Sequence, residues 1–447
     1  MLRVAVVGSG PSGVYTAQTL VQQDPSVHVD VLDRLPCPYG LVRYGVAPDH
    51  EKIKSLQNNL RTVLEHERVR FLGGVEVGPA GLPVERLREL YHAVVYCVGA
   101  ATDRHLGIPG EDLWGSWSAT EFVSWYSAHP DSLTDGFVLG ARAAVVIGVG
   151  NVAVDVTRML ARGATELSPT DMPQDALAAL AASEVTQVHM VGRRGPSQAR
   201  FTTKELRELG SMPETRVSVN PSELELDPAY VDPSGLPAPQ RRNVEVLRGW
   251  ASSPTGDDRH TISLRFFLRP VEFLADGDRV CGVRFERTEP DGRGGVTGTG
   301  EYEEIEAQLV LRSVGYRGVP LDGLPFDAER GTVPHLAGRV LREGVVAPGE
   351  YVAGWIKRGP TGVIGTNRPC AKETVTSLLE DASVLARRKV SGDPLATLRS
   401  AGITPVEWSG WQAIERAEAE LGASLGRGVV KLPDWKSLLE AARSGSA

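Results

Sequence analysis

The chain has 447 residues, enough for two or three domains that each bury a core. Its 48 basic and 56 acidic side chains give a net charge of −8, so no nucleic-acid partner is expected. No run of 18 apolar residues and no signal-peptide pattern occurs, and we expect a cytoplasmic protein without a membrane span. The four cysteines stand far apart, without CxxC or zinc spacing, which predicts reduced thiols and no metal site.

Apolar runs bounded by glycine alternate with helical patterns along the chain. Near-continuous apolar character is typical of parallel strands covered on both faces, so we expect an α/β fold with doubly wound sheets. Strand-like segments at Ile262–Phe267 and Val280–Glu286, next to loop-like stretches at 251–262 and 289–300, predict an antiparallel insertion. The expected strands of the main sheets are Val4–Gly8, Val27–Leu32, Val94–Gly99, Ala143–Gly148, Val185–Val191, Leu309–Gly315 and Tyr351–Gly354.

The first strand leads into a glycine-rich turn. Gly8, Gly10 and Gly13 have GxGxxG spacing: the first permits a tight turn, the second lets a pyrophosphate approach, and the third lets a helix pack on the sheet. Asp33 ends the next strand, where an acid accepts hydrogen bonds from ribose hydroxyls and repels a 2′-phosphate. The motif predicts FAD or NAD rather than NADP; the alternative for Asp33 is a solvated strand end.

A second glycine turn occurs later in the chain. Gly148, Gly150 and Ala153 have GxGxxA spacing, an accepted variant of the motif. The matching second strand ends in Arg193 and Arg194, whose guanidinium groups can bind a 2′-phosphate through charge-assisted hydrogen bonds. A surface basic pair is the alternative. Opposite charges at corresponding places predict two different nucleotides, and the simplest pair is FAD with NADP(H).

Three further features each admit two interpretations. His50, in a Gly/Pro-rich loop, is either a polar contact or proton donor for a flavin, or a structural or solvated histidine. Glu205 and Glu208 share one helix face after Thr202, so they are either functional or simply favoured near a capped helix start. Trp355 either packs on a flavin or belongs to the core.

Five segments carry a family resemblance: Pro38–His50, Gly148–Asp155, Val191–Glu208, Leu311–Pro320 and Gly354–Asn367. Together they resemble the adrenodoxin reductase family, and within it the bacterial NADPH–ferredoxin reductases. The resemblance runs in order from Val4 to about Asn367 and then thins out. The chain departs from the family pattern at Tyr39, Tyr44, Val149 and Arg368-Pro369-Cys370.

The resemblance implies a glutathione-reductase-like flavoprotein with two doubly wound Rossmann-like domains. The FAD domain would comprise 1–101 and 322–447, with a helical C-terminal extension, and the NADP domain, 102–321, would be inserted in it. In the family, the residues that match His50 and Glu208 influence hydride transfer. The implied FAD contacts are Ser12, Asp33, Leu41, Val75, Trp355, Gly362, Val363 and Ile364, and the implied NADP contacts are Arg104, Asn151, Val152, Ala153, Val154, Arg193, Arg194, Glu205 and Gly362.

The implied reaction is reversible hydride transfer from NADPH to FAD, followed by release of single electrons to a ferredoxin. The acceptor would be a small acidic iron–sulfur protein, with cytochrome P450s as candidates for the next step. Candidate basic clusters for docking are Arg200-Lys204-Arg207, Arg241-Arg242 and Lys357-Arg358. The alternatives are a flavin monooxygenase or other NADPH-dependent flavoenzyme, and a non-enzymatic nucleotide-binding protein; the missing CxxC argues against a dithiol relay.

Overall fold

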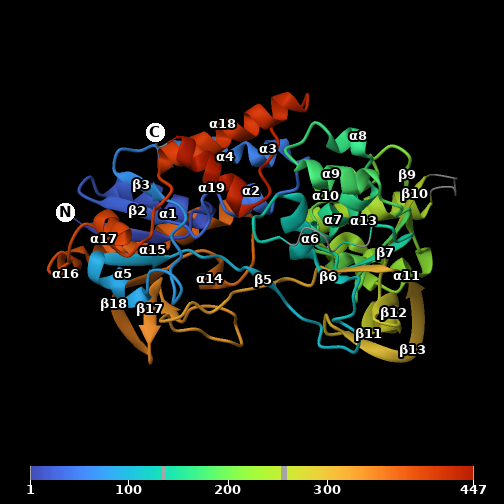
Figure 1. Ribbon diagram of the computed structural model, residues 1–447. Helices are drawn as coiled ribbons and strands as arrows, with labels where there is room; N and C mark the ends of the chain where they lie inside the picture. The colour runs from blue at the N-terminus through green and yellow to red at the C-terminus, as the bar shows by residue number, and fades with distance from the viewer. Residues whose placement is uncertain (1, 133–136, 138, 253–258, 446–447) are drawn as a thin grey trace. The chain divides into compact units, whose positions relative to one another are not determined.

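The chain forms two compact units in the computed structural model, which describes residues 2–132, 137, 139–252 and 259–445 (Figure 1). Unit 1 comprises Met1–Thr102, Ser127–Asp131 and Tyr316–Ala447, and unit 2 comprises Asp103–Tyr126 and Ser132–Gly315. The chain passes from one unit to the other within β5 (Thr102–Asp103), on either side of Ser127–Asp131, and just before β15 (Tyr316–Arg317). The loop expected around residues 253–257 lies outside the described residues.

Unit 1 is built on a seven-stranded sheet in the order β16-β17-β18-β4-β1-β2-β3. Its central strands run parallel, and β16 and β17 add an antiparallel edge. Val4 and Val6 of β1 belong to the core on one face and Ala5 and Val7 to the core on the other, which explains the continuous apolar run. The strands are β1 (Arg3–Val7), β2 (His28–Leu32), β3 (Val69–Leu72), β4 (Ala93–Tyr96), β16 (His335–Leu336), β17 (Arg339–Arg342) and β18 (Val345–Val352).

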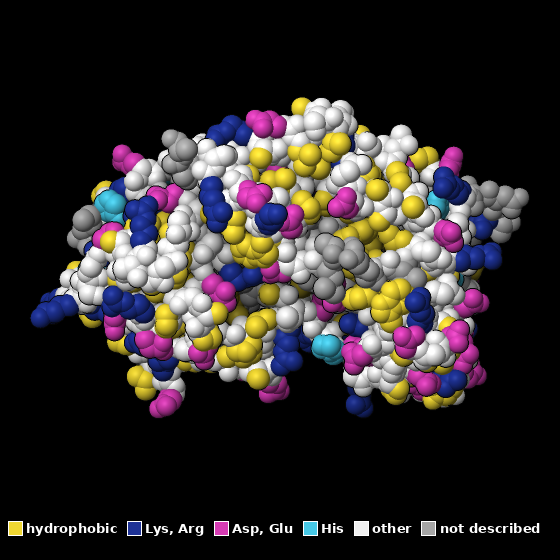
Figure 2. Space-filling view, in the orientation of Figure 1, with side chains coloured by type: hydrophobic (Ala, Val, Ile, Leu, Met, Phe, Trp, Pro, Cys, Tyr) yellow, Lys and Arg dark blue, Asp and Glu magenta, His cyan; other side chains and the backbone are white. Residues whose placement is uncertain are grey.

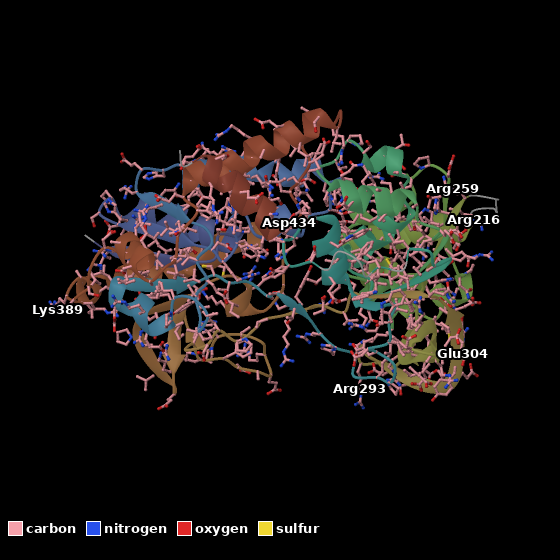
Figure 3. The ribbon with its side chains drawn as sticks, viewed as in Figure 1. Arg216, Arg259, Arg293, Glu304, Lys389 and Asp434 are labelled. Atoms are coloured by element: carbon pink, nitrogen blue, oxygen red, sulfur yellow. The ribbon has the colours of Figure 1, made fainter. Side chains whose placement is uncertain are left out.

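Helices cover both faces of the sheet in unit 1. The core that contains Val4 and Val6 includes residues of α1, α4, α15, α18 and α19, whereas α5 and α17 pack on the opposite face. Asp434, labelled in Figure 3, caps the last helix by accepting a hydrogen bond from Ser437 N. The helices are α1 (Pro11–Gln23), α2 (Leu41–Tyr44), α3 (Glu51–Lys54), α4 (Leu56–Leu64), α5 (Val84–Leu90), α14 (Trp355–Arg358), the 3-10 turn η3 (Ile364–Thr366), α15 (Asn367–Glu380), α16 (Ala382–Leu385), α17 (Pro394–Ser400), α18 (Trp408–Ser424) and α19 (Trp435–Ser444).

Unit 2 is built on a six-stranded parallel sheet in the order β6-β14-β7-β8-β10-β9. Ala144 and Val146 face a core made with helices, whereas Val145 and Ile147 face the antiparallel sheet β11-β12-β13. The elements are β6 (Ser116–Ser118), α6 (Ala119–Tyr126), β7 (Ala143–Ile147), α7 (Asn151–Ala161), α8 (Ala164–Leu167), α9 (Gln174–Ala181), β8 (Gln187–Val191), η1 (Pro196–Gln198), α10 (Thr203–Leu209), β9 (Thr215–Val219), α11 (Pro221–Glu225), α12 (Pro228–Val231), η2 (Pro233–Gly235), α13 (Ala238–Ala251), β10 (His260–Arg265), β11 (Leu268–Asp276), β12 (Arg279–Pro290), β13 (Val296–Glu306) and β14 (Leu309–Arg312).

The predicted Rossmann-like α/β architecture is confirmed, and two details of the insertion differ. Strand β10, which covers most of Ile262–Phe267, lies in the parallel sheet between β8 and β9 instead of the antiparallel one. The loop expected at 289–300 is shorter, because β12 continues to Pro290 and β13 begins at Val296. Strand β13 is largely exposed, so its polar composition resembles that of a loop. Within the described residues, no helix has the length and apolar character that crossing a membrane requires.

Candidate nucleotide-binding sites

The first glycine turn connects β1 to α1 in unit 1. A Cβ on Gly13 would lie 1.8 Å from the carbonyl oxygen of Gly8, so only glycine lets the helix approach the turn this closely. Gly8 itself has φ +108°, which also favours glycine. Gly10 is the N-cap of α1, and no side chain caps this helix. Its first N–H groups therefore suit a pyrophosphate.

Asp33 follows β2 and contacts the same turn. Its carboxylate accepts hydrogen bonds from Ser9 N at 2.8 Å, from Ser9 Oγ at 2.6 Å and from Leu35 N at 2.9 Å. Burial raises the pKa of Asp33, although these hydrogen bonds oppose the rise. Since a carboxylate has about four acceptor positions, one remains for a ribose hydroxyl. Asp33 thus fixes the glycine turn as well, a role that the sequence motif did not indicate.

The segment that begins at Tyr39 lies against the glycine turn. Tyr39 N donates to Ser9 O at 3.1 Å, and a Cβ on Gly40 would lie 2.9 Å from Gly10 Cα. Leu41 begins α2 and is 38% exposed, so it is available to a ligand at this place. His50 is buried at the start of α3, which excludes the interpretation as a solvated histidine.

Two further predicted contacts lie near these elements. Val75 is buried, and its N–H donates to Asp33 O at 2.8 Å. After β18, a Cβ on Gly354 would lie 2.3 Å from Ser12 Oγ, so this glycine brings the late turn against the start of α1. Trp355 is half-buried, packs 5.4 Å from the Tyr316 ring and donates its indole N–H to Thr361 O. It therefore offers a ligand its ring rather than a hydrogen bond.

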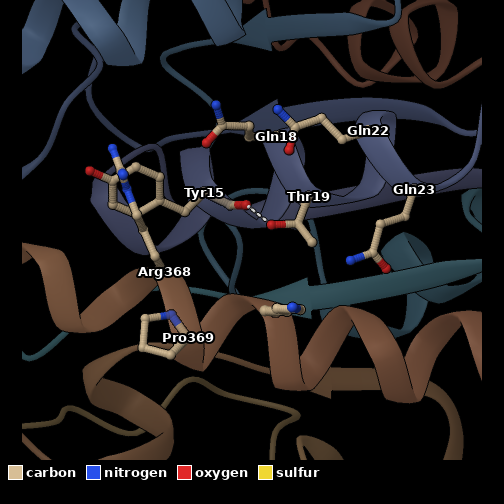
Figure 4. Close-up of a pocket in the computed structure, with 8 residues that line it drawn as sticks. Tyr15, Gln18, Thr19, Gln22, Gln23, Arg368 and Pro369 are labelled. Atoms are coloured by element: carbon tan, nitrogen blue, oxygen red, sulfur yellow. Dashed lines mark hydrogen bonds between the residues drawn. The ribbon is translucent and has the colours of Figure 1, made fainter.

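The late turn continues into η3 and α15. Gly362 has φ +84°, which favours glycine, and Val363 is 65% exposed immediately before Ile364 begins η3. The segment Arg368-Pro369-Cys370, which departs from the family pattern, lies in the first turn of α15, and its residues face different sides of the helix. Cys370 is buried and its Sγ accepts a hydrogen bond from Gly354 N at 3.2 Å. Arg368 lies over the Tyr15 ring at 4.9 Å in a hollow of about 600 Å³ between α1 and α15 (Figure 4).

Unit 1 thus presents an uncapped helix start, glycines that leave room for a ligand, a carboxylate at the end of the second strand and an exposed apolar turn. These residues fit FAD: the helix start suits its pyrophosphate, the acid its ribose, and the apolar turn its ring. The predicted contacts that unit 1 brings to these elements are Gly8, Gly10, Ser12, Gly13, Asp33, Leu41, Val75, Trp355, Gly362, Val363 and Ile364.

The second glycine turn connects β7 to α7 in unit 2. Gly148 has φ +138°, and a Cβ there would lie 2.2 Å from Ser313 O. Gly150 is the N-cap of α7, again without a side-chain cap. Asn151 Oδ1 accepts a hydrogen bond from Thr202 N at 2.8 Å and so joins the turn to the segment before α10. The remaining predicted contacts of the turn, Val152, Ala153 and Val154, lie in the first turns of α7.

Arg193 and Arg194 follow β8 at the same end of the sheet. Arg193 is exposed and Arg194 is half-buried. Burial lowers the pKa of Arg194, and the charges of Arg193 and Arg200 lower it further. Over the described residues, no carboxylate lies within 4.0 Å of these three arginines. An anion bound here would relieve their mutual repulsion. Arg104, also predicted to contact NADP, is exposed in unit 2, and its N–H donates to Gly315 O.

The two glutamates lie on α10, whose capped start is confirmed: Thr202 Oγ accepts from Glu205 N at 3.3 Å. Arg158 of α7 is fully buried and faces both glutamates. Its guanidinium lies 3.7 Å from Glu205, 3.6 Å from Glu208 and 2.8 Å from Asp155. Sequence reasoning missed Arg158, because a buried arginine in an amphipathic helix cannot be distinguished by pattern from an exposed one.

The predicted basic clusters differ in exposure. Arg200, Lys204 and Arg242 line one hollow of about 720 Å³ in unit 2, so two of the clusters lie together. The Lys357-Arg358 cluster is not an exposed patch. Lys357 is buried and donates to Glu373 at 2.8 Å and to Thr374 at 3.0 Å. The charge of Lys357 is paired with Glu373 inside unit 1, so the prediction of a docking patch at Lys357-Arg358 is wrong.

Comparisons with known proteins agree with this geometry. The family model described as pyridine nucleotide-disulphide oxidoreductase matches residues 2–219. The mitochondrial NADPH:adrenodoxin oxidoreductase of Arabidopsis thaliana is 41% identical over 99% of this chain and 95% of that protein. NADPH-ferredoxin reductase FprA of Mycobacterium tuberculosis is 43% identical over 98% of both chains. The solved structure of M. tuberculosis FprA in complex with NADPH is similar with a TM-score of 0.93, at 41% identity over 99% of both chains.

The chain has two Rossmann-like units, and at corresponding strand ends one carries an acid and the other carries arginines. This arrangement defines a pyridine-nucleotide oxidoreductase of the flavoprotein type. All four cysteines are free. The chain belongs to the family of the NADPH:adrenodoxin oxidoreductases and the FprA-type NADPH–ferredoxin reductases.

Proposed function

We propose that this protein is a ferredoxin–NADP(+) reductase, which carries reducing equivalents from NADPH through FAD to a small iron–sulfur protein of the ferredoxin type. One observation carries the proposal: Asp33 and the Arg193–Arg194 pair stand at corresponding strand ends of two glycine-turn units. When bound, FAD accepts a hydride and passes electrons on singly, which joins a two-electron donor to a one-electron acceptor.

In this proposal unit 1 binds FAD. The uncapped start of α1 holds the pyrophosphate, and Asp33 accepts a hydrogen bond from the adenosine ribose. Leu41, Val75, Trp355 and the turn Gly362–Ile364 supply the apolar surroundings of the ring. His50, buried in the same unit, contributes to hydride transfer by its position near the flavin.

Unit 2 binds NADP(H). The uncapped start of α7 and Asn151–Val154 hold the pyrophosphate, and Arg193 and Arg194 bind the 2′-phosphate. Glu205 contacts the nucleotide, and Glu208 influences hydride transfer. The interpretation of both acids as mere dipole partners is less favoured, because Arg158 binds them as a pair inside the unit.

The acceptor is proposed to be an acidic ferredoxin, despite the net charge of −8. The local surface decides docking, and on the face seen in Figure 2 basic and acidic side chains are interspersed. The hollow with Arg200, Lys204 and Arg242 is the candidate basic surface on unit 2. Onward delivery to cytochrome P450s and a cytoplasmic location complete the proposal; free thiols suit a reducing compartment.

The test is a visible spectrum of the purified chain, followed by NADPH under nitrogen and then by an acidic [2Fe–2S] ferredoxin. We expect bound flavin, bleaching of its visible band by NADPH more readily than by NADH, and reduction of the ferredoxin. A chain that takes up no FAD would contradict the proposal. NADPH consumption that needs oxygen and an organic substrate, with no ferredoxin reduction, would indicate a monooxygenase.

A further inference from the structure

Three of the charged side chains that unit 1 buries are connected to one another, and the nucleotide sites do not explain their role. Arg43 is on α2, Glu418 is on α18, and Lys431 follows α18 in the C-terminal part of the chain. Their exposed fractions are 4%, 2% and 2%. Removing charges from water costs several kcal/mol for each ion unless close partners compensate. Their partners therefore show what these charges hold in place.

Arg43 is held by the C-terminal part of the chain at both its side chain and its backbone. Its guanidinium donates to both carboxylate oxygens of Glu418, from Nη1 at 3.1 Å and from Nη2 at 2.5 Å. The same guanidinium lies 5.0 Å from the ring centre of Trp411. Lys431 Nζ donates to Arg43 O at 2.6 Å and to Ser127 O at 3.2 Å. Residues far along the chain thus fix both ends of one arginine.

The C-terminal partners are tied to each other as well. Glu418 Oε1 accepts from Leu432 N at 3.0 Å, and Glu418 O accepts from Val430 N at 3.1 Å. The segment that carries Lys431 is therefore bound to α18 through the same residue that binds Arg43. An apolar substitute for Glu418 would fill the space but would lose the three polar contacts of its side chain, with Arg43 Nη1, Arg43 Nη2 and Leu432 N.

Arg43 lies in a segment that has little structure of its own. Helix α2 has four residues and no side-chain cap, and so short a helix is unstable without outside contacts. Its start at Gly40 touches Gly10 of the first glycine turn. Trp411 of α18 also packs edge-on against Tyr39, with ring centres 5.8 Å apart. The position of Leu41 on the glycine turn consequently depends on α18.

We propose that Glu418 and Lys431 are positioning residues for the FAD site, which act through Arg43 by holding α2 and Leu41 against the first glycine turn. This gives the C-terminal extension a function in cofactor retention. The proposal rests on the assignment of FAD to unit 1. It does not depend on the coenzyme preference of unit 2 or on the identity of the electron acceptor.

The experiment uses the full-length protein loaded with FAD and the variants Glu418→Gln and Lys431→Met. Glutamine keeps the size of the side chain but leaves the Arg43 charge without its partner. Methionine removes the hydrogen bonds from Lys431 to the backbone oxygens of Arg43 and Ser127. Because either change loosens α2 against the glycine turn, we expect FAD to leave at least about ten times faster than from the parent. Release is followed by the fluorescence of freed flavin, and the circular dichroism of the bound flavin should change at visible wavelengths.

Two variants of the same helix serve as controls. Glu415→Gln removes a charge that pairs with the partly exposed Arg61, and Ile414→Val removes a buried methylene without removing a charge. The FAD release rate of each protein is measured at the same interval below its own melting temperature, so that a general loss of stability does not change the comparison. We expect both controls to release FAD within about threefold of the parent and to keep its flavin dichroism.

Release rates of Glu418→Gln and Lys431→Met equal to those of the controls would overturn the proposal. If Glu418→Gln does not fold, the FAD release rates of Glu418→Asp and Lys431→Met are compared with those of the controls instead, and equal rates would again overturn the proposal. A parent that binds no FAD would overturn the proposed function and this proposal together. A parent that binds FAD, with variants that retain it equally well, would overturn this proposal alone.

Discussion

Replacing Arg193 and Arg194 by alanine should reduce the use of NADPH while leaving NADH almost unaffected. Both arginines follow β8 at the end of the sheet where the second glycine turn lies, and both lack a carboxylate partner within the described residues. NADPH carries a 2′-phosphate that can occupy this cationic place, whereas NADH has a hydroxyl there. Only the phosphorylated coenzyme should therefore lose binding energy.

The size of the effect follows from exposure. A hydrogen bond to a charged group contributes about 1.5–3 kcal/mol, but contacts of exposed charges are weakened by water and by the entropy of ordering long side chains. Arg193 is exposed and Arg194 is half-buried, so we expect about 1.5–3 kcal/mol for the pair rather than for each. This corresponds to a loss of about 10- to 150-fold in kcat/KM for NADPH.

The assay is steady-state reduction of a small dye with each coenzyme at fixed ionic strength. The matched control is Arg142→Ala with Arg259→Ala, which removes the same charge from exposed residues just before β7 and β10, at the opposite end of the sheet. Figure 3 labels Arg259. It should change kcat/KM for NADPH less than about twofold. Equal losses for NADPH and NADH, or an equal loss in the control, would refute phosphate recognition by these arginines.

Other consequences can be measured independently. Glu208→Gln and His50→Ala should keep the flavin but change the rate of its reduction by NADPH in stopped flow; parent rates in both would leave only structural roles. Gly13→Ala should lose FAD and lower the melting temperature by several degrees, because the added methyl group collides with the turn. A normal flavin content would contradict that. Ferredoxin reduction should slow as ionic strength rises above about 0.1 M, where the Debye length is about 10 Å, and reduction of a neutral dye should respond much less. Burial raises the pKa of Cys37 to about 11 and that of Cys97 to about 12, so both thiols should resist iodoacetamide at pH 8 in the folded protein, as peptide mass spectrometry would show. Because both pKa values are raised in the folded state, their contribution to the free energy of unfolding is complete below about pH 8.5 and is lost as the pH rises through the folded-state pKa values. Rapid alkylation at pH 8 would contradict buried neutral thiols.

The glycine turns were predictable because their requirements are largely local. A strand, a turn with positive φ at its first glycine and a helix that packs on the turn all follow from ten consecutive residues at Val4–Gly13 and again at Ala144–Ala153. The cap of α10 is likewise local, since Thr202 and Glu205 lie three positions apart. Such features depend on backbone geometry that the sequence specifies directly.

The buried charges were not predictable, because their partners lie far apart in the sequence. Arg43 and Glu418 are 375 positions apart, and Glu418 lies in a helix whose many acids resemble a solvated face. Lys357 looked like part of an exposed cluster, yet Glu373 binds it inside unit 1. A sequence shows that a residue is charged, but only the fold shows whether water or another residue surrounds the charge.

The strand order of unit 1 also has a consequence during synthesis on the ribosome. All of unit 2 has been translated once the chain reaches Gly315, but β4 of unit 1 pairs with β18, and α18 is made later still. At about 5–20 residues per second, the nascent chain spends about 13 to 50 seconds with β1–β4 made and one edge of that sheet unpaired. An open parallel edge is a place where other chains can add. Truncated or slowly translated forms should therefore aggregate through unit 1, while unit 2 is already able to fold.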